Sequence, residues 1–242
     1  MKANQLQRLP AIEAAEKIIK RYFPECEGAI LAGSVVRGQE SPTSDLDIVV
    51  FDSSLAVSYR ESFVELGWPV ELFCHNLESY QAFLKNDCER ARPCLPRMIA
   101  EGTVLKDKGI LDEIKHEAVA LLNAGPEKWD AATIKLKRYF LTDVLDDFIG
   151  TSNRSEAIFI AGHLGELAAE FFLRTNKRWI GSSKWLIRSI AEFDESYAIA
   201  FAEAFDIFYK IDDKCKVIHF VEDILEPHGG RLFEGFSLGK GK

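Results

Sequence analysis

Two aspartates, Asp45 and Asp47, open the apolar run 46–51 (LDIVVF), and this pair constrains the chain more than any other feature of its sequence. The run is rich in β-branched residues, which is typical of a buried strand. Because side chains alternate between the two faces of a strand, both aspartates are predicted to point to the same side. Neighbouring carboxylates repel each other, so the pair indicates a cation site. Mg²⁺, which binds carboxylate and phosphate oxygens, suits it.

A glycine–serine pair, Gly33-Ser34, follows the apolar run 28–32, which we interpret as a strand ending in a sharp turn. A glycine lets the backbone approach a phosphate closely, and a helix beginning there would present free N–H groups. The Ser34 hydroxyl would add a further donor. The pattern predicts a phosphate-binding turn that faces the two aspartates, which is the arrangement that nucleotidyl transfer with two metal ions needs.

Residues 1–108 mix helical and strand-like patterns, which predicts an α/β domain with a small mixed sheet. An amphipathic helix is expected at 11–23, strands at 28–32, 46–51, 68–74 and 103–106, and a helix at 77–85. The spacing of 55–66 predicts a further helix, with Asp52 capping its start and Gly67 following its end.

From residue 109 onwards the pattern is helical, which predicts an all-α helical bundle domain over 109–242. Apolar residues recur at helical spacing, and glycines mark the breaks. The expected helices are 110–123, 131–149, 155–175, 183–193, 195–210 and 214–225. The aromatic residues of the last helices are predicted to belong to the core.

The turn and the aspartates together form a longer motif. Its parts are Gly33-Ser34, Arg37-Gly38 and Ser44-Asp45-Leu46-Asp47. This motif resembles the DNA polymerase beta nucleotidyltransferase superfamily, and within it the bacterial minimal and aminoglycoside nucleotidyltransferases. In that pattern a third carboxylate lies on the strand after an intervening helix, and Glu71 is the residue that matches.

The resemblance implies both a site and a reaction. Asp45 and Asp47 would each ligate two Mg²⁺ ions, and Glu71 would ligate one of them. The nucleotide-binding residues would be Gly33, Ser34, Arg37 and Ser44. An enzyme of this kind transfers a nucleoside monophosphate from an NTP to an acceptor hydroxyl and releases pyrophosphate.

Several side chains keep two interpretations. Arg37 either reaches the triphosphate or pairs with an acid. Glu166 shares a helix face with His163, and it is either hydrogen-bonded in the core or the base that deprotonates the acceptor. Other acids are either alternative bases or an exposed helix face: Asp143, Asp146 and Asp147. A basic cluster is either a solvated face or a nucleotide contact: Arg174, Lys177, Arg178, Lys184 and Arg188.

The net charge of −8 argues against a nucleic-acid partner, because proteins that grip nucleic acid are usually basic. It favours a small, aminoglycoside-like acceptor, since an acidic pocket attracts a polycation. The alternatives are transfer onto a partner protein, as in antitoxin-type enzymes, and a nucleotide sensor without catalysis. No apolar segment is long enough to span a membrane, and the cysteines lack a CxxC pair, so we expect a cytoplasmic protein. A homodimer is compatible with the sequence.

Overall fold

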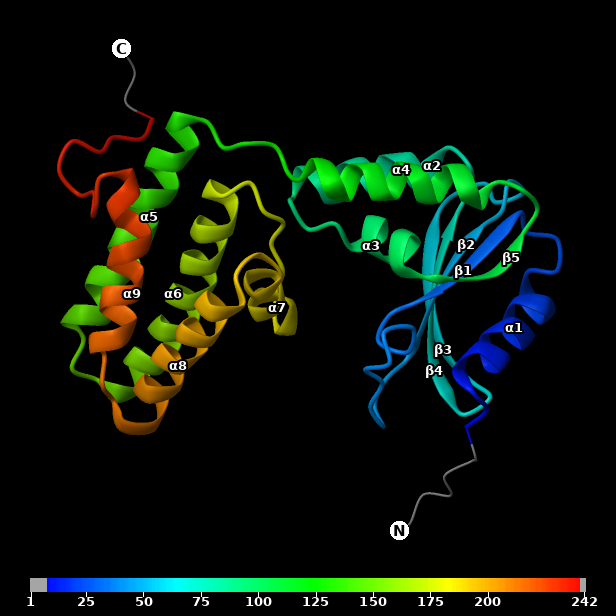
Figure 1. The fold of residues 1–242 in the computed structure, drawn as a ribbon, viewed down its shortest axis with the longest axis horizontal. Helices are drawn as coiled ribbons and strands as arrows, with labels where there is room; N and C mark the ends of the chain where they lie inside the picture. Colours follow the sequence, from blue (N-terminus) through cyan, green and yellow to red (C-terminus); the bar gives the residue numbers. More distant parts are fainter. Residues whose placement is uncertain (1–7, 240–242) are drawn as a thin grey trace, which may run out of the picture. The chain divides into compact units, whose positions relative to one another are not determined.

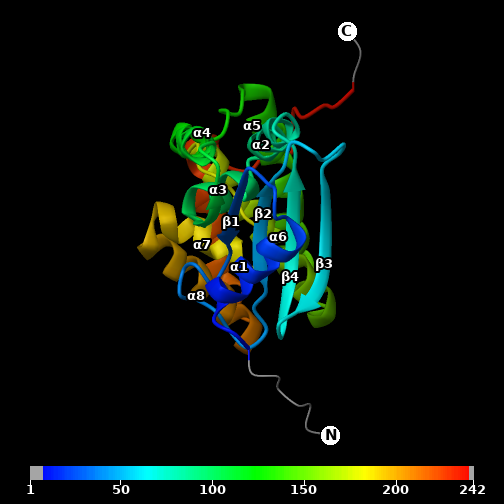
Figure 2. The same cartoon turned by 90° about the vertical axis from the view of Figure 1, so that its right-hand side faces the viewer.

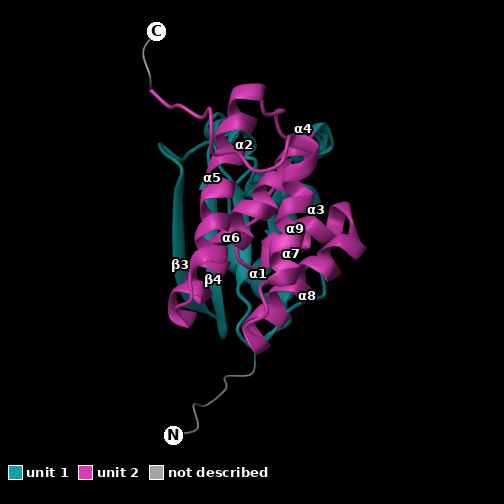
Figure 3. Cartoon of the chain, turned by 90° about the vertical axis from the view of Figure 1, so that its left-hand side faces the viewer, with its two compact units in different colours: residues 1–124 teal, residues 125–242 magenta. Residues whose placement is uncertain are grey.

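The computed structural model describes residues 8–239 and divides the chain into two compact units between Ala124 and Gly125 (Figure 3). The first unit contains, in chain order, α1 (Ala11–Tyr22), β1 (Gly28–Ala32), β2 (Leu46–Phe51), β3 (Tyr59–Glu65), β4 (Trp68–His75), α2 (Ser79–Glu89), α3 (Cys94–Glu101), β5 (Thr103–Asp107) and α4 (Leu111–Ala124). The second contains α5 (Ala131–Gly150), α6 (Arg154–Thr175), α7 (Lys184–Phe193), α8 (Glu195–Ile211), α9 (Cys215–Leu225) and the short 3₁₀-helix η1 (Glu226–His228).

The strands of the first unit form one mixed sheet in the order β3-β4-β2-β1-β5 (Figure 1). β2 and β4 run parallel, and in their register Asp47 lies opposite Glu71. The other neighbouring strands are antiparallel. The predicted α/β domain with a small mixed sheet, followed by a helical region, is therefore confirmed.

Helices cover both faces of this sheet (Figure 2). Because side chains alternate along β2, the strand contributes apolar residues to both faces. On one face Leu46, Ile48 and Val50 pack in a cluster with apolar residues of α1, and all three are 0% exposed. On the other face Val49 and Phe51 pack with apolar residues of α2, α3 and α4. The sheet is thus held between two apolar layers, each stabilised by about 25 cal/mol per Å² of buried apolar surface.

The segment 55–66 is not the predicted helix; most of it is the strand β3, which forms a hairpin with β4. Leu66 and Gly67 make the two-residue turn, and both have positive φ, +51° and +82°. Such turns match the twist of the paired strands, so the hairpin is favoured over a helix. Pairing with β4 outweighs the helical spacing of the segment, as tertiary contacts often do. Asp52 accordingly caps a turn, where its Oδ1 accepts bonds from the backbone and hydroxyl of Ser54 at 2.9 and 2.6 Å.

The division between the units lies beyond the expected boundary at residue 108, because α4 belongs to the first unit. Leu111, Ile114 and Ala118 of α4 are buried in the cluster that covers the second sheet face. A helical pattern alone does not tell which core a helix joins. The helix α3, which begins after Pro93, has no counterpart among the sequence predictions.

The second unit is the expected helical bundle, and its helices begin and end within about a residue of the predicted positions. Its core contains Leu145, Phe148, Leu164 and Phe208, each 0% exposed. No helix of the described residues is long and apolar enough to cross a membrane.

Candidate metal centre at the end of the sheet

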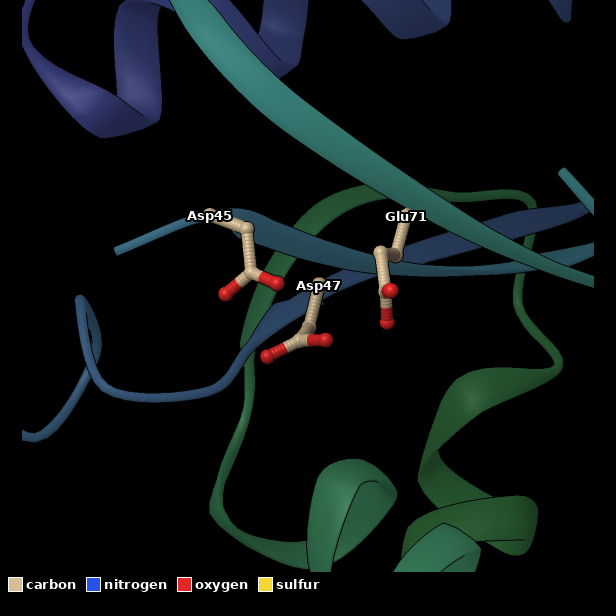
Figure 4. A group of neighbouring side chains, drawn as sticks. All are labelled: Asp45, Asp47 and Glu71. Carbon is tan, nitrogen blue, oxygen red and sulfur yellow. The ribbon is translucent and has the colours of Figure 1, made fainter. Parts of the chain in front are cut away.

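Three carboxylates meet at one end of the first unit's sheet: Asp45, Asp47 and Glu71 (Figure 4). The parallel register of β2 and β4 sets Asp47 beside Glu71, and Asp45 precedes Asp47 by two residues, so all lie on the same face. One oxygen of each lies within 4.8 Å of the others. Among residues 8–239 this is the one such group of three or more carboxylate, imidazole or thiol side chains. Such a set of oxygen donors fits a hard cation such as Mg²⁺.

Gly33 leaves the space that the Asp47 carboxylate occupies. The last residue of β1, Ala32, pairs with Asp47, so the chain turns directly beneath that side chain. Gly33 has φ +83°, and a Cβ added to it would stand 2.2 Å from Asp47 Oδ2. Both the backbone conformation and the close approach therefore require glycine here. This contact explains why a glycine follows β1 in a chain that carries its acids on β2.

The segment after Gly33 is a series of turns, in agreement with the sharp turn predicted after the strand, and no helix begins there. Ser44 holds its two ends together. The buried Ser44 Oγ accepts a bond from the Ser34 hydroxyl at 3.0 Å and one from the Ser41 backbone N–H at 2.8 Å. Ser34 and Ser44, both predicted to bind nucleotide, thus bond to each other and brace the loop that leads into Asp45.

Two arginines lie at the carboxylates. Arg37 forms an ion pair with Glu101 at 3.2 Å, which is the pairing alternative of its two interpretations. Arg60 of β3 forms an ion pair with Glu71 Oε2. Sequence reasoning missed Arg60, because a helix over 55–66 would have carried it away from β4. The two-residue turn at Leu66-Gly67 is the signal that could have found it.

The pKa of Asp47 is raised from 3.8 to about 6. Burial is the largest cause, followed by the negative charges of Asp45 and Glu71. The charges of Arg60 and Arg37 oppose the shift. At a pH below about 6 this carboxyl group mostly holds its proton, and above that pH its charge would be stabilised by a nearby cation.

The acids and the histidine that the sequence analysis singled out in the second unit are exposed. His163 and Glu166 are exposed on α6, so the expected core hydrogen bond is not their role. Asp143, Asp146 and Asp147 are exposed, in agreement with a solvated face.

The basic residues 174–188 do not form one surface. Arg174 is 6% exposed and donates from Nη2 to the Glu127 carbonyl oxygen at 2.8 Å. Lys177, Arg178 and Lys184 are exposed. The expected aromatic core is present in part: Phe201, Phe205 and Phe208 of α8 are buried, whereas Tyr209 of the same helix is 42% exposed.

Comparison with known proteins shows a distant structural likeness. No family model matches the chain, and no curated protein matches it. Among solved structures, the chain is similar to a nucleotidyltransferase-like protein from Exiguobacterium sibiricum 255-15. The two are 15% identical, the match covers 89% of this chain and 73% of that one, and the TM-score is 0.47.

Proposed function

We propose that this chain is an enzyme that transfers a nucleoside monophosphate from an NTP to an acceptor hydroxyl, with Mg²⁺ held by Asp45, Asp47 and Glu71. The observation that carries the proposal is the meeting of these carboxylates within 4.8 Å, over a glycine that makes room for one of them. A sensor that only bound a nucleotide would have no need for such a costly group of charges.

In the proposed reaction the acceptor oxygen attacks the α-phosphorus of the NTP. A new O–P bond forms, the bond from the α-phosphorus to the α–β bridging oxygen breaks, and pyrophosphate leaves with that electron pair. The acceptor proton passes to a base. Bound Mg²⁺ would supply charge stabilisation on the phosphates and lower the pKa of the acceptor hydroxyl.

The chain's own residues would set the geometry. Asp45 and Asp47 are fixed by the start of β2, and Glu71 by its register with Asp47. Gly33 and the turns after it would offer backbone N–H groups to the β- and γ-phosphates at short range. Ser44, by bonding Ser34 and Ser41, would keep this loop in place.

We propose a small hydroxylated polycation, aminoglycoside-like in its chemistry, as the acceptor. The net charge of −8 supports this class, because an acidic protein attracts cations and repels polyanions such as nucleic acid. Glu166, exposed on α6, has no contact in the described structure that assigns it as the acceptor's base. Transfer onto a partner protein stays the alternative, and an acceptor screen separates the two.

The test is calorimetric titration of ATP, GTP, CTP and UTP with Mg²⁺ and with EDTA, followed by pyrophosphate release with candidate acceptors. Asp47→Asn is expected to lower turnover by at least about a thousandfold while the protein stays folded. Asp52→Asn is the matched control, because Asp52 caps a turn and is not one of the three carboxylates. Turnover retained in Asp47→Asn would refute the proposed site. Nucleotide binding that does not depend on Mg²⁺, with no release of pyrophosphate, would favour the sensor.

A further inference from the structure

Arg60 contacts the proposed metal site from the neighbouring strand. It lies on β3 opposite Phe73 of β4, and two residues along β4 from Phe73 is Glu71, on the same face. The Arg60 guanidinium pairs with Glu71 Oε2, and its Cζ lies 4.8 Å from the centre of the Phe73 ring. The Arg60 side chain is 58% exposed and that of Glu71 27%. The hairpin therefore delivers one cation to one of the three carboxylates.

The Arg60–Glu71 contact differs from an ordinary surface ion pair, because Glu71 lies in a group of three carboxylates. The carboxylates of Asp45, Asp47 and Glu71 lie within 4.8 Å of one another, and without a counter-ion they would repel strongly. Arg60 and Arg37 are the cations that act on Asp47. Arg37 forms an ion pair with Glu101, and Glu101 also pairs with Arg97. Arg60 forms an ion pair with Glu71, one of the three proposed ligands. A bound metal ion would interact with the same carboxylate.

We infer that Arg60 is a built-in counter-ion that stands in for the metal when the site is empty. It neutralises Glu71 in the metal-free protein and gives up that carboxylate when the cation binds. The guanidinium then stays beside the site on the Phe73 ring, where an aromatic face holds a cation. This inference rests on the metal site of the proposed function and adds a competitor within the chain to it.

Such a competitor has a measurable consequence. A cation that must displace Arg60 binds more weakly than one that meets three unpaired carboxylates. The guanidinium, which remains close, also repels the bound cation. The empty protein should therefore hold its metal weakly, and the negative phosphates of an NTP should strengthen metal binding by balancing the charge of Arg60. Metal and nucleotide would then each strengthen the binding of the other.

The experiment measures Mn²⁺ binding to the full chain without nucleotide, by the loss of the free-ion electron paramagnetic resonance signal at pH 8 and low salt. Arg60→Met removes the charge and keeps a long side chain. It is expected to bind Mn²⁺ about tenfold more tightly than wild type. Arg60→Lys, which keeps the charge, should stay within about threefold of wild type. The gain in Arg60→Met should shrink in high salt, because screening weakens the repulsion.

Arg21→Met is the matched control, since Arg21 pairs with Glu65 on the same hairpin, and Glu65 is not one of the three ligands. Its Mn²⁺ affinity should equal that of wild type. Far-ultraviolet circular dichroism of each variant confirms that the hairpin and its sheet are intact.

The outcomes separate this inference from the proposed function. Equal or weaker Mn²⁺ binding by Arg60→Met overturns the counter-ion role and leaves the metal site standing. Tighter binding by Arg60→Met, together with no pyrophosphate release from wild type with any NTP and any acceptor of the screen, supports the counter-ion and counts against the proposed transferase activity. If neither wild type nor Arg60→Met binds Mn²⁺, both the metal site and the role of Arg60 fail.

Discussion

The two faces of the first unit's sheet differ although the same strands build them. On the face that packs with α1, the β2 side chains of Leu46, Ile48 and Val50 are all 0% exposed. On the face that packs with α2, α3 and α4, Val49 is equally buried, but the next residue toward the strand's start on that face is the partly exposed Asp47. One face is apolar to its end, and the other ends in acids.

A single strand, β2, therefore contributes both to a closed apolar core and to a cluster of acids. Because side chains alternate between the two faces of a strand, every second residue of β2 can be apolar and buried in the core, while a residue between them, such as Asp47, carries charge. The closed face stabilises the sheet through apolar burial. The acidic end of the other face, which we call the open end, destabilises the folded protein when Asp47 is ionised. Burial and the neighbouring acids raise the pKa of Asp47 to about 6, which shows that its charged form is disfavoured there. The proposed site is therefore built where the fold tolerates a local loss of stability.

The largest effect is expected on the closed face. Ile48→Ala removes a fully buried side chain next to Asp47 and should lower the free energy of unfolding by about 3–4 kcal/mol. Because Ile48 points to the face opposite the acids, Mn²⁺ affinity of the folded variant should change by less than about threefold. Urea denaturation and metal titration measure the two quantities. A loss of affinity parallel to the loss of stability would show that the faces are not independent.

Gly33→Ala tests the open end. The new Cβ would stand 2.2 Å from Asp47 Oδ2 at φ +83°, so the carboxylate must move and the backbone is strained. We expect metal affinity to fall by about thirtyfold and the free energy of unfolding by on the order of 2 kcal/mol. The control is Gly38→Ala, whose φ is +64° and whose Cβ would meet nothing within 4 Å. Equal metal affinities in the two alanine variants would contradict the close approach at Gly33.

Asp47→Asn separates the stability of the sheet's acidic end from its proposed activity, because it should stabilise the metal-free protein and abolish the proposed transfer. Folding raises the pKa of Asp47 from 3.8 to about 6, so the folded protein binds the proton more tightly than the unfolded chain does. The stability contributed by that proton is complete below pH about 4 and is lost as the pH rises through about 6.

In EDTA at pH 8, Asp47→Asn should therefore unfold with a free energy on the order of 2 kcal/mol higher than wild type. The gain should diminish between pH 6 and pH 4, the interval between the two pKa values. Chemical denaturation across this range measures it, with Asp52→Asn as the control that shows no gain. A gain that does not depend on pH would mean that carboxylate repulsion is not its cause.

Ser44→Ala has the smallest expected effect. Its hydroxyl accepts bonds from Ser34 and from the Ser41 backbone, and it is 9% exposed. Loss of these bonds should lower the free energy of unfolding by about 1 kcal/mol and metal affinity by about threefold, since the loop before Asp45 loosens. Gln39→Ala, at an exposed position of the same loop, should change neither. Unchanged metal affinity in Ser44→Ala would mean that the loop is held by its backbone alone.

Much of the first unit followed from local pattern. The apolar run of β2 and the spacing of Asp45 and Asp47 predicted a buried strand with both acids on one side, and the structure has both. Prediction failed at 55–66, where the apolar spacing suits a helix and a strand alike. A short segment of this kind is decided by its partner, and here the partner is β4. The same error concealed Arg60.

The pattern of residues along the chain is enough to place Asp45 and Asp47 on one strand face, because the period of a strand is set by local backbone geometry. It also determined the helical character of residues after Gly125, since their helical periodicity runs from one helix to the next. Contacts between distant segments, in contrast, place Glu71 beside Asp47, Asp47 over Gly33 and Arg60 against Glu71. They depend on strand order and register. Both are set by interactions between residues far apart in the sequence, which local patterns do not reveal.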